Sequence, residues 1–229
     1  MTDKNNEEIR KIADGLDTKA ALKQEVYSHT LKVFNSFAKV ASEIHSTLSE
    51  DIRDKPSVEI ELNRKGDFEF HLKFSGDTLV FIMHTNVFTF PPDHEINKKG
   101  YVKANPDRGY FGMIQVFNFL SDSIKYNRRA DMGYLLGRVF VNFEDRFYVD
   151  GKRQLGFLFK GLAKQVINDD NIAKIIEQAM LYCLDFDLYV PPVEAMAQMS
   201  LEQKNAFNNV HGLPTGKRVG FKIENIKKG

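Results

Sequence analysis

The chain has 229 residues, and its 32 basic and 31 acidic side chains leave a net charge of +1. This near-neutral balance argues against a dedicated nucleic-acid binder, which usually carries a basic excess. The single cysteine, Cys183, excludes an internal disulfide, and no apolar run approaches the roughly 18 residues of a membrane span. Because the first residues also lack the pattern of a secretory signal, we expect a cytoplasmic protein without a membrane partner.

The N-terminal part of the chain is typical of helix. Residues from Asn5 to Ala13 predict a short polar helix that stops at Asp14-Gly15, since glycine is common just past a helix end. Residues 1–18 would then form an arm with freedom to move. From Lys19 to about Ile52, apolar side chains recur every three or four positions and predict a helix roughly 50 Å long. This stripe suits either an amphipathic helix laid across a sheet or the seam of a homodimer formed by residues 19–52.

After Pro56 the spacing of apolar residues changes to two, which indicates strands. Residues 58–62 and 68–74 predict a hairpin, with the first strand at or near an edge because its outward face is charged. The next strand, 78–90, is apolar at both odd and even positions, and this pattern predicts that both of its faces are covered. We expect these three strands to form an antiparallel meander.

The second half of the chain predicts more strands and a C-terminal helix. Residues 111–120 and 133–142 read as further apolar strands, and 147–149 as a short one, whereas 155–159 fits either strand or helix. Residues 168–170 cap a helix to about 184, and a shorter helix near 200–209 and an edge strand at 219–223 follow before the tail at 211–229 ends. The sequence therefore predicts a single α+β domain over residues 1–229, with an antiparallel sheet of about six strands flanked by the long N-terminal helix and C-terminal helices.

One group of residues has the chemistry of a metal site. His84, Asp93 and His94 offer imidazole and carboxylate ligands that suit zinc or non-haem iron, and a strand followed by a loop can bring them together. Such a site would indicate a metal-assisted hydrolase. Their spacing matches no compact metal motif, and a hydrogen-bonded core histidine is the competing interpretation of His84.

Two polar segments are candidates for ligand binding because long polar connections are uncommon unless they have a function. They flank the strand at 111–120, at its opposite ends, so they do not line one pocket unless the chain bends. The segment 93–110 is also free to meet the turn at Glu144. The candidate residues are Asn105, Asp107, Arg108, Tyr110, Arg128 and Arg129.

Basic doublets offer a different kind of site. Arg128-Arg129, Lys152-Arg153 and Lys217-Arg218 would form an anion patch for a nucleotide or nucleic acid if the fold gathered them. Nothing in the charge balance requires that they gather, so nucleic acid stays a minor alternative.

The sequence contains no catalytic constellation that we can identify. Cys183 lies on the apolar face of a predicted helix rather than at a helix N-terminus, and no G-x-S-x-G nucleophile motif occurs. We therefore assign no catalytic residue and expect no cofactor. The leading hypothesis is a non-catalytic binding or regulatory module that contacts a protein or small ligand and self-associates; the hydrolase and the nucleotide or nucleic-acid binder are the alternatives.

Overall fold

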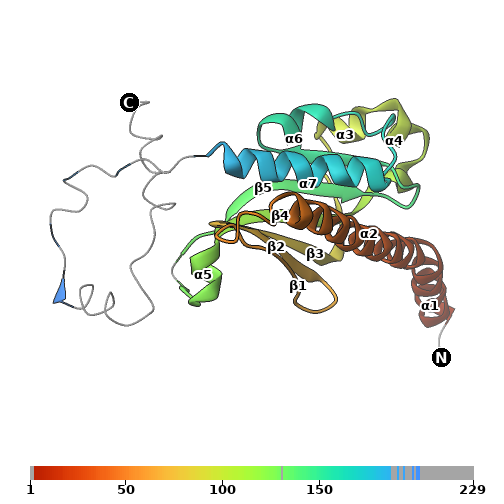
Figure 1. The fold of residues 1–229 in the computed structure, drawn as a ribbon. Coiled ribbons are helices and arrows are strands. Elements are labelled where there is room, and N and C mark those ends of the chain that lie inside the picture. The colour runs from red at the N-terminus through yellow and green to blue at the C-terminus, as the bar shows by residue number, and fades with distance from the viewer. Residues whose placement is uncertain are drawn as a thin grey trace.

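A computed structural model describes residues 3–129 and 131–186, together with the single residues 190, 193, 198, 200 and 201. In these residues the fold is a six-stranded sheet in which every neighbouring pair is antiparallel and the strands follow chain order (Figure 1). The α+β class and the six strands were predicted correctly. The expected edge strand and tail lie outside the described residues, as does the helix near 200–209 apart from its first two positions. The strands are β1 (Ile60–Arg64), β2 (Glu69–Phe74), β3 (Asp77–Thr89), β4 (Tyr110–Leu120), β5 (Tyr134–Val141) and β6 (Phe147–Gly151).

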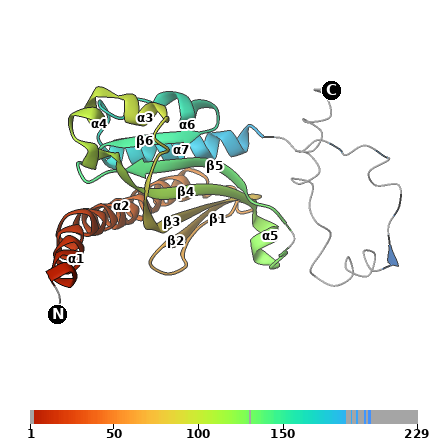
Figure 2. The same cartoon turned by 180° about the vertical axis from the view of Figure 1, so that it is seen from behind.

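Two long helices cover one face of the sheet. The helices α2 (Ala21–Asp51) and α7 (Asp169–Leu184) lie side by side on that face, and the opposite face of the central strands is visible from behind (Figures 1 and 2). The apolar stripe expected on α2 is buried against the chain's own sheet, as expected of an amphipathic helix laid across a sheet. Its buried members are Val26, Val33, Phe34, Phe37, Val40 and Ala41, and those of α7 are Ile172, Ile175, Ile176, Ala179, Met180 and Cys183.

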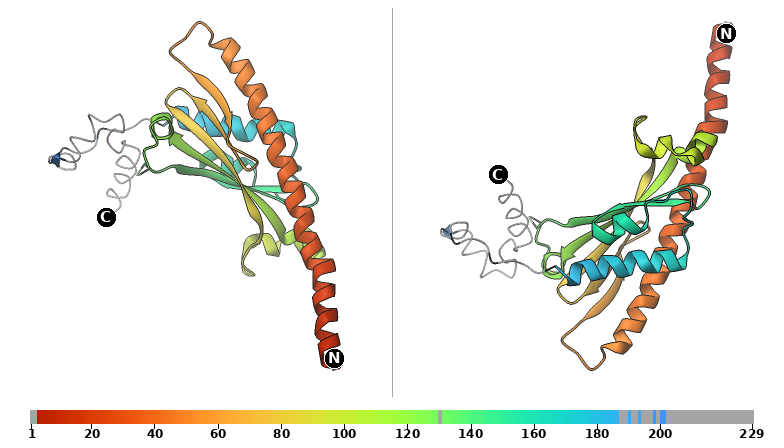
Figure 3. Two further views of the ribbon diagram at one scale, coloured as in Figure 1. Left: turned by 90° about the horizontal axis from the view of Figure 1, so that it is seen from below. Right: turned by 90° about the horizontal axis from the view of Figure 1, so that it is seen from above.

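The N-terminal arm is helical without a break. α1 (Asp3–Gly15) runs through a π-helical turn, η1 (Leu16–Ala20), directly into α2. The predicted stop at Gly15 is wrong: this glycine keeps a right-handed helical φ of −64°, and the Thr18 hydroxyl donates to the Asp14 carbonyl at 2.7 Å instead of capping a new helix. The arm projects past the sheet (Figure 3), and every side chain from position 6 to position 19 is exposed.

The polar segment after β3 is compact rather than an open loop. It forms α3 (Glu95–Lys98), α4 (Gly100–Ala104) and a 3-10 turn, η2 (Pro106–Gly109). These pieces pack on part of the second face of the sheet and close a smaller apolar cluster there. Its buried members are Ile96, Val102, Phe111, Met113, Phe140 and Leu162.

Two shorter helices complete the described fold. α5 (Ser121–Lys125) follows β4, and α6 (Arg153–Leu158) shows that the ambiguous stretch at 155–159 is mainly helical. Arg138 on β5 pairs with Asp150, its cross-strand neighbour on β6. No helix in the described part of the chain is long and apolar enough to cross a bilayer.

A close contact fixes the N-terminal half of α2 on the sheet. Thr30 is fully buried, and its hydroxyl donates to the Val26 carbonyl at 2.7 Å. It lies directly over Gly112 of β4, where an added Cβ would be 1.8 Å from the Thr30 oxygen. Only glycine lets the helix approach β4 this closely, and the contact sets the distance between α2 and the end of β3.

Candidate functional site

The far end of β3 extends beyond its neighbour on one side. β2 pairs with β3 only as far as Ile82, and the last contact is the amide of Met83, which donates to the Phe68 carbonyl at 2.9 Å. β3 nevertheless continues to Thr89. On its other side the pairing with β4 is irregular between His84 and Phe88, so that three β3 residues lie opposite one β4 residue.

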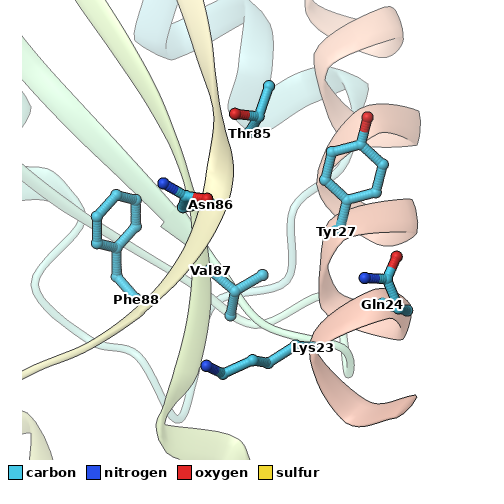
Figure 4. Close-up of a pocket in the computed structure, with 7 residues that line it drawn as sticks. All are labelled: Lys23, Gln24, Tyr27, Thr85, Asn86, Val87 and Phe88. Carbon is cyan, nitrogen blue, oxygen red and sulfur yellow. The ribbon is translucent and has the colours of Figure 1, made fainter. Parts of the chain in front are cut away.

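A cleft of about 670 Å³ separates this end of β3 from the N-terminal half of α2. Figure 4 shows Lys23 of the helix reaching toward Val87 of the strand, while the side chains of Asn86 and Phe88 lie on the side of the strand away from the helix. Its volume falls within the roughly 300–1,000 Å³ that small-molecule sites occupy, although it is open rather than enclosed. The lining residues are Lys23, Gln24 and Tyr27 of α2 and Thr85, Asn86, Val87 and Phe88 of β3.

The cleft has the chemistry of a binding site. Its only charged lining group, among the residues described, is the ammonium of Lys23. Two amides and two hydroxyls supply hydrogen-bond donors and acceptors, while Val87 and Phe88 add apolar surface. The described lining includes no carboxylate, imidazole or thiol, the groups that most often serve as acid, base or strong nucleophile. The cleft is therefore better suited to holding a ligand than to transforming it.

The residues proposed as metal ligands each have a local structural role. The amide of Asn86 donates to Nδ1 of His84 at 3.0 Å, and the amide of Ile96 donates to Nδ1 of His94 at 3.3 Å, which caps α3. The His94 ring also stacks on Phe90, with ring centroids 4.3 Å apart. Asp93 precedes this cap in a turn. In the described part of the chain, no three His, Cys, Asp or Glu side chains are grouped as a metal site requires.

The segment 93–110 and the turn at Glu144 do meet, in a closed polar network. Tyr101 donates its hydroxyl proton to Glu144 at 2.7 Å, and Nε of Arg108 donates to the same carboxylate at 3.0 Å. The Tyr101 hydroxyl accepts from the fully buried Asn142 at 2.9 Å. The Arg108 guanidinium lies 4.6 Å from the centre of the Tyr101 ring. These groups bind one another, so the network holds the fold at this point and Arg108 forms part of it.

The pKa values in this network follow its contacts. The hydrogen bond from Tyr101, followed by that from Arg108, lowers the pKa of Glu144 below its ordinary value of 4.5 despite opposing desolvation. Burial is the largest cause that raises the pKa of Tyr101 above 10.0. Glu144 is therefore ionised and Tyr101 neutral near pH 7, as a carboxylate that pairs directly with Arg108 and accepts from the phenol requires.

The other predicted ligand residues occupy separate places. Asn105 caps η2 by accepting from the Asp107 amide at 3.0 Å, and Tyr110 begins β4. Arg128 and Arg129 follow α5 at the opposite end of β4, where they border a cavity of about 280 Å³. Nε and Nη1 of Arg128 are buried there without a hydrogen-bond partner among the residues described.

The basic doublets do not form one patch among the residues described. Lys152-Arg153 borders a different cavity, in which the Arg153 guanidinium lies 5.0 Å from the centre of the Tyr182 ring. The third doublet, at 217–218, lies outside the described residues.

Comparisons with known proteins give no identification: no protein family, curated protein or solved structure matches this chain.

No residue of the cleft could be identified as a site residue from the sequence. One signal was available in the strand lengths, because a predicted strand of thirteen residues beside one of seven must leave part of its edge unpaired. The contribution of Lys23, Gln24 and Tyr27 had no such signal, since they belong to a helix whose position relative to the strand is set by tertiary packing.

Proposed function

We propose that the protein is a non-catalytic binding module that holds its ligand in the cleft between α2 and β3. The observation that carries this proposal is the composition of the cleft, which combines hydrogen-bonding groups and one ammonium with little reactive chemistry. A ligand with an anionic group and several hydrogen-bonding groups would complement it.

An NMR fragment screen on the full chain tests this proposal. Amide shifts caused by anionic fragments should be concentrated at Lys23 and Thr85 and their neighbours in the cleft. Reversing the charge with Lys23→Glu should weaken these fragments about tenfold, because a favourable charge contact becomes repulsive.

Lys32→Glu is the matched control for that variant. Lys32 is exposed on the same helix, nine residues and about half a turn away from Lys23, and borders none of the described cavities. It should leave fragment binding unchanged. Shifts concentrated instead in the groove between α2 and α7, around Leu48 and Leu184, would contradict the cleft as the site.

Self-association is a second candidate, favoured by the projecting arm. Ile9, Ile12 and Leu16 are 52%, 62% and 62% exposed, and their spacing of three and four places them on one side of the helix. In a single chain these side chains remain in water, whereas a second copy would bury them. The contact would involve the arm, since the apolar stripe of α2 already packs on the sheet.

Light scattering after size exclusion tests the second candidate. The wild-type chain should be dimeric at about 100 µM and dissociate on dilution, since association follows mass action. Ile12→Lys should be monomeric, whereas Asn6→Lys, which adds the same charge at an exposed polar position of the arm, should still dimerise. A wild-type chain that stays monomeric throughout would exclude this contact.

A further inference from the structure

We propose that the cleft takes an extended peptide, which adds as a strand to the free edge of β3 and places an acidic side chain at Lys23. This inference rests on the proposed function of the cleft and names its ligand class. Addition of a strand is one of the common modes of peptide recognition: backbone hydrogen bonds supply affinity, and alternate side chains supply specificity.

Few edges of the described sheet are available for a further strand. The outer edge of β6 is taken, because the amide of Val149 donates to the Phe159 carbonyl at 3.2 Å and Arg146 forms a bridge with Val166. β1 is an open edge, but it contains Glu61, and Glu59 directly precedes it. Charged residues on an edge strand discourage the addition of another strand. In the described part of the sheet, the other edge without a strand partner is the side of β3 that faces away from β4 beyond Met83, and a cleft adjoins it.

The backbone of β3 presents hydrogen-bonding groups to this cleft. The amide of Met83 points toward β2, as its bond to Phe68 shows. Because strand groups alternate from side to side, and the pairing with β4 is regular as far as His84, we infer that the amide and carbonyl of Thr85 point to the side that β2 does not reach. The edge from Thr85 to Thr89 would extend over about 17 Å, at roughly 3.4 Å per residue, which suits a peptide of five residues.

The side chains of the cleft indicate what this peptide carries. Lys23 is half-buried on the helix wall opposite β3, so an Asp or Glu of the peptide would meet it there. Val87 is half-buried on the strand wall and favours an apolar side chain beside it, whereas the ring of Phe88 packs with the second apolar cluster on the other face of the sheet. The two walls therefore favour an extended segment that combines an acidic residue with an apolar one.

A displayed library of random peptides of about ten residues, long enough to pass the edge at 3.4 Å per residue, provides the probe. Enriched peptides should contain Asp or Glu, and Lys23→Glu should weaken them about tenfold while Lys32→Glu does not. Methylating the peptide's backbone amides one at a time needs no change in the protein. Methylation of the amides that point toward β3, which are every second one, should lower the affinity about tenfold or more, since it removes a hydrogen bond and blocks close approach. Methylation of the amides between them, which point away from β3, should change the affinity little.

The outcomes separate this inference from the proposed function. Peptides that are sensitive to Lys23→Glu but show no alternation in the methylation series would overturn strand addition and leave the cleft as a binding site. Failure to enrich any peptide would also overturn it, while fragment shifts in the cleft would still support the proposed function. Peptides that bind with alternation but are insensitive to Lys23→Glu would place strand addition on another edge and overturn the inference for β3.

Discussion

The two halves of β3 differ in almost every respect although they form one strand. From Thr78 to Phe81 each residue is buried, with β2 on one side and β4 on the other. From Thr85 to Thr89 the side chains are exposed or half-buried, β2 is absent and the pairing with β4 is irregular. One half thus belongs to the core, and the other is a strand edge beside a cleft.

This difference arises from the neighbours of β3 rather than from its own residues. Both halves contain phenylalanine and valine, and both have high β-propensity. The first half is covered because α2 and the paired strands surround it. The second half reaches past the turn between β1 and β2, so its backbone groups lose a partner. Whether a stretch of strand lies in the core or forms a free edge therefore depends on which neighbouring strands extend alongside it.

The largest expected effect is the loss of a ring in the first half. Phe81 is fully buried and stacks on Phe70 with ring centroids 4.5 Å apart. Phe81→Ala should lower the free energy of unfolding by about 3–5 kcal/mol, measured by urea denaturation, because it leaves a cavity in a close-packed core. Phe88→Ala makes the same chemical change in the second half, where the ring is half-buried, and should cost less than about 2 kcal/mol. Equal losses would mean that the two halves are equally part of the core.

Much of the fold could be predicted from the sequence because each signal was local. The alternation at 68–74 and the spacing of three and four along α2 come from burial of one face, and the structure has both. The pattern at 78–90 correctly indicated burial on both faces for the first half of β3 and was wrong for the second. The periodicity of a sequence shows which residues are apolar, but it does not show how far a neighbouring strand extends.

A smaller effect is expected where the two halves of β3 meet. Gly112 lies opposite the irregular segment of β3 and beneath Thr30, whose oxygen a new Cβ would approach to 1.8 Å. Gly112→Ala should cost about 2 kcal/mol, because overpacking a close contact forces the helix away from the sheet. This corresponds to a melting temperature roughly 4–8 °C lower for a domain of this size, measured by calorimetry.

Gly76→Ala is the control for that change. A Cβ at Gly76 would meet no atom within 4 Å, and its φ lies outside the left-handed region. Its melting temperature should stay close to that of the wild type. If Gly112→Ala were equally harmless, α2 could shift on the sheet, and the width of the cleft would not be fixed by this contact.

The network at Glu144 supports the second half of β3 from behind, through the cluster that contains Phe111. Glu144→Gln should cost about 1 kcal/mol at pH 7, since a charge-assisted pair in a partly exposed site is replaced by neutral hydrogen bonds. Because folding lowers the pKa of Glu144, the folded state binds fewer protons, and the carboxylate stabilises it above pH 4.5. That contribution is lost as the pH falls through the lowered pKa. The difference between wild type and variant, from urea denaturation, should therefore shrink below pH 4.5.

Glu43→Gln serves as the comparison for this variant. Glu43 is 61% exposed, and its carboxylate lies 3.7 Å from the ammonium of Lys39 in a surface ion pair. It should change the free energy of unfolding by less than about 0.5 kcal/mol at any pH. A gap between wild type and Glu144→Gln that stayed constant from pH 7 to pH 3 would show that Glu144 acts by packing rather than by charge.

The candidate site was much harder to predict than the fold. The segment that contains Arg108 and the turn at Glu144 were expected to be free to meet, yet Arg108 and Glu144 form an ion pair with each other. The sequence does not distinguish Lys23, because one lysine on a solvated helix resembles any other. Its environment depends on the contact between Thr30 and Gly112, residues 82 positions apart, and no local pattern reports such a contact.

The smallest expected effect on stability is at the free edge itself. Thr85 is exposed and its side chain has no hydrogen bond within the described part of the chain, so Thr85→Ala should change the free energy of unfolding by less than about 0.5 kcal/mol.

Hydrogen exchange gives the sharper comparison. The amide of Phe81 should exchange only through global unfolding, whereas that of Thr85, pointing away from β4 at an edge without a partner strand, should exchange orders of magnitude faster. The amide of Asn86 should lie between them, because it donates to His84, and His84→Ala should accelerate it without affecting Phe81. Slow exchange at Thr85 in the free protein would mean that its amide is already bonded, and the edge would then have no room for a peptide strand.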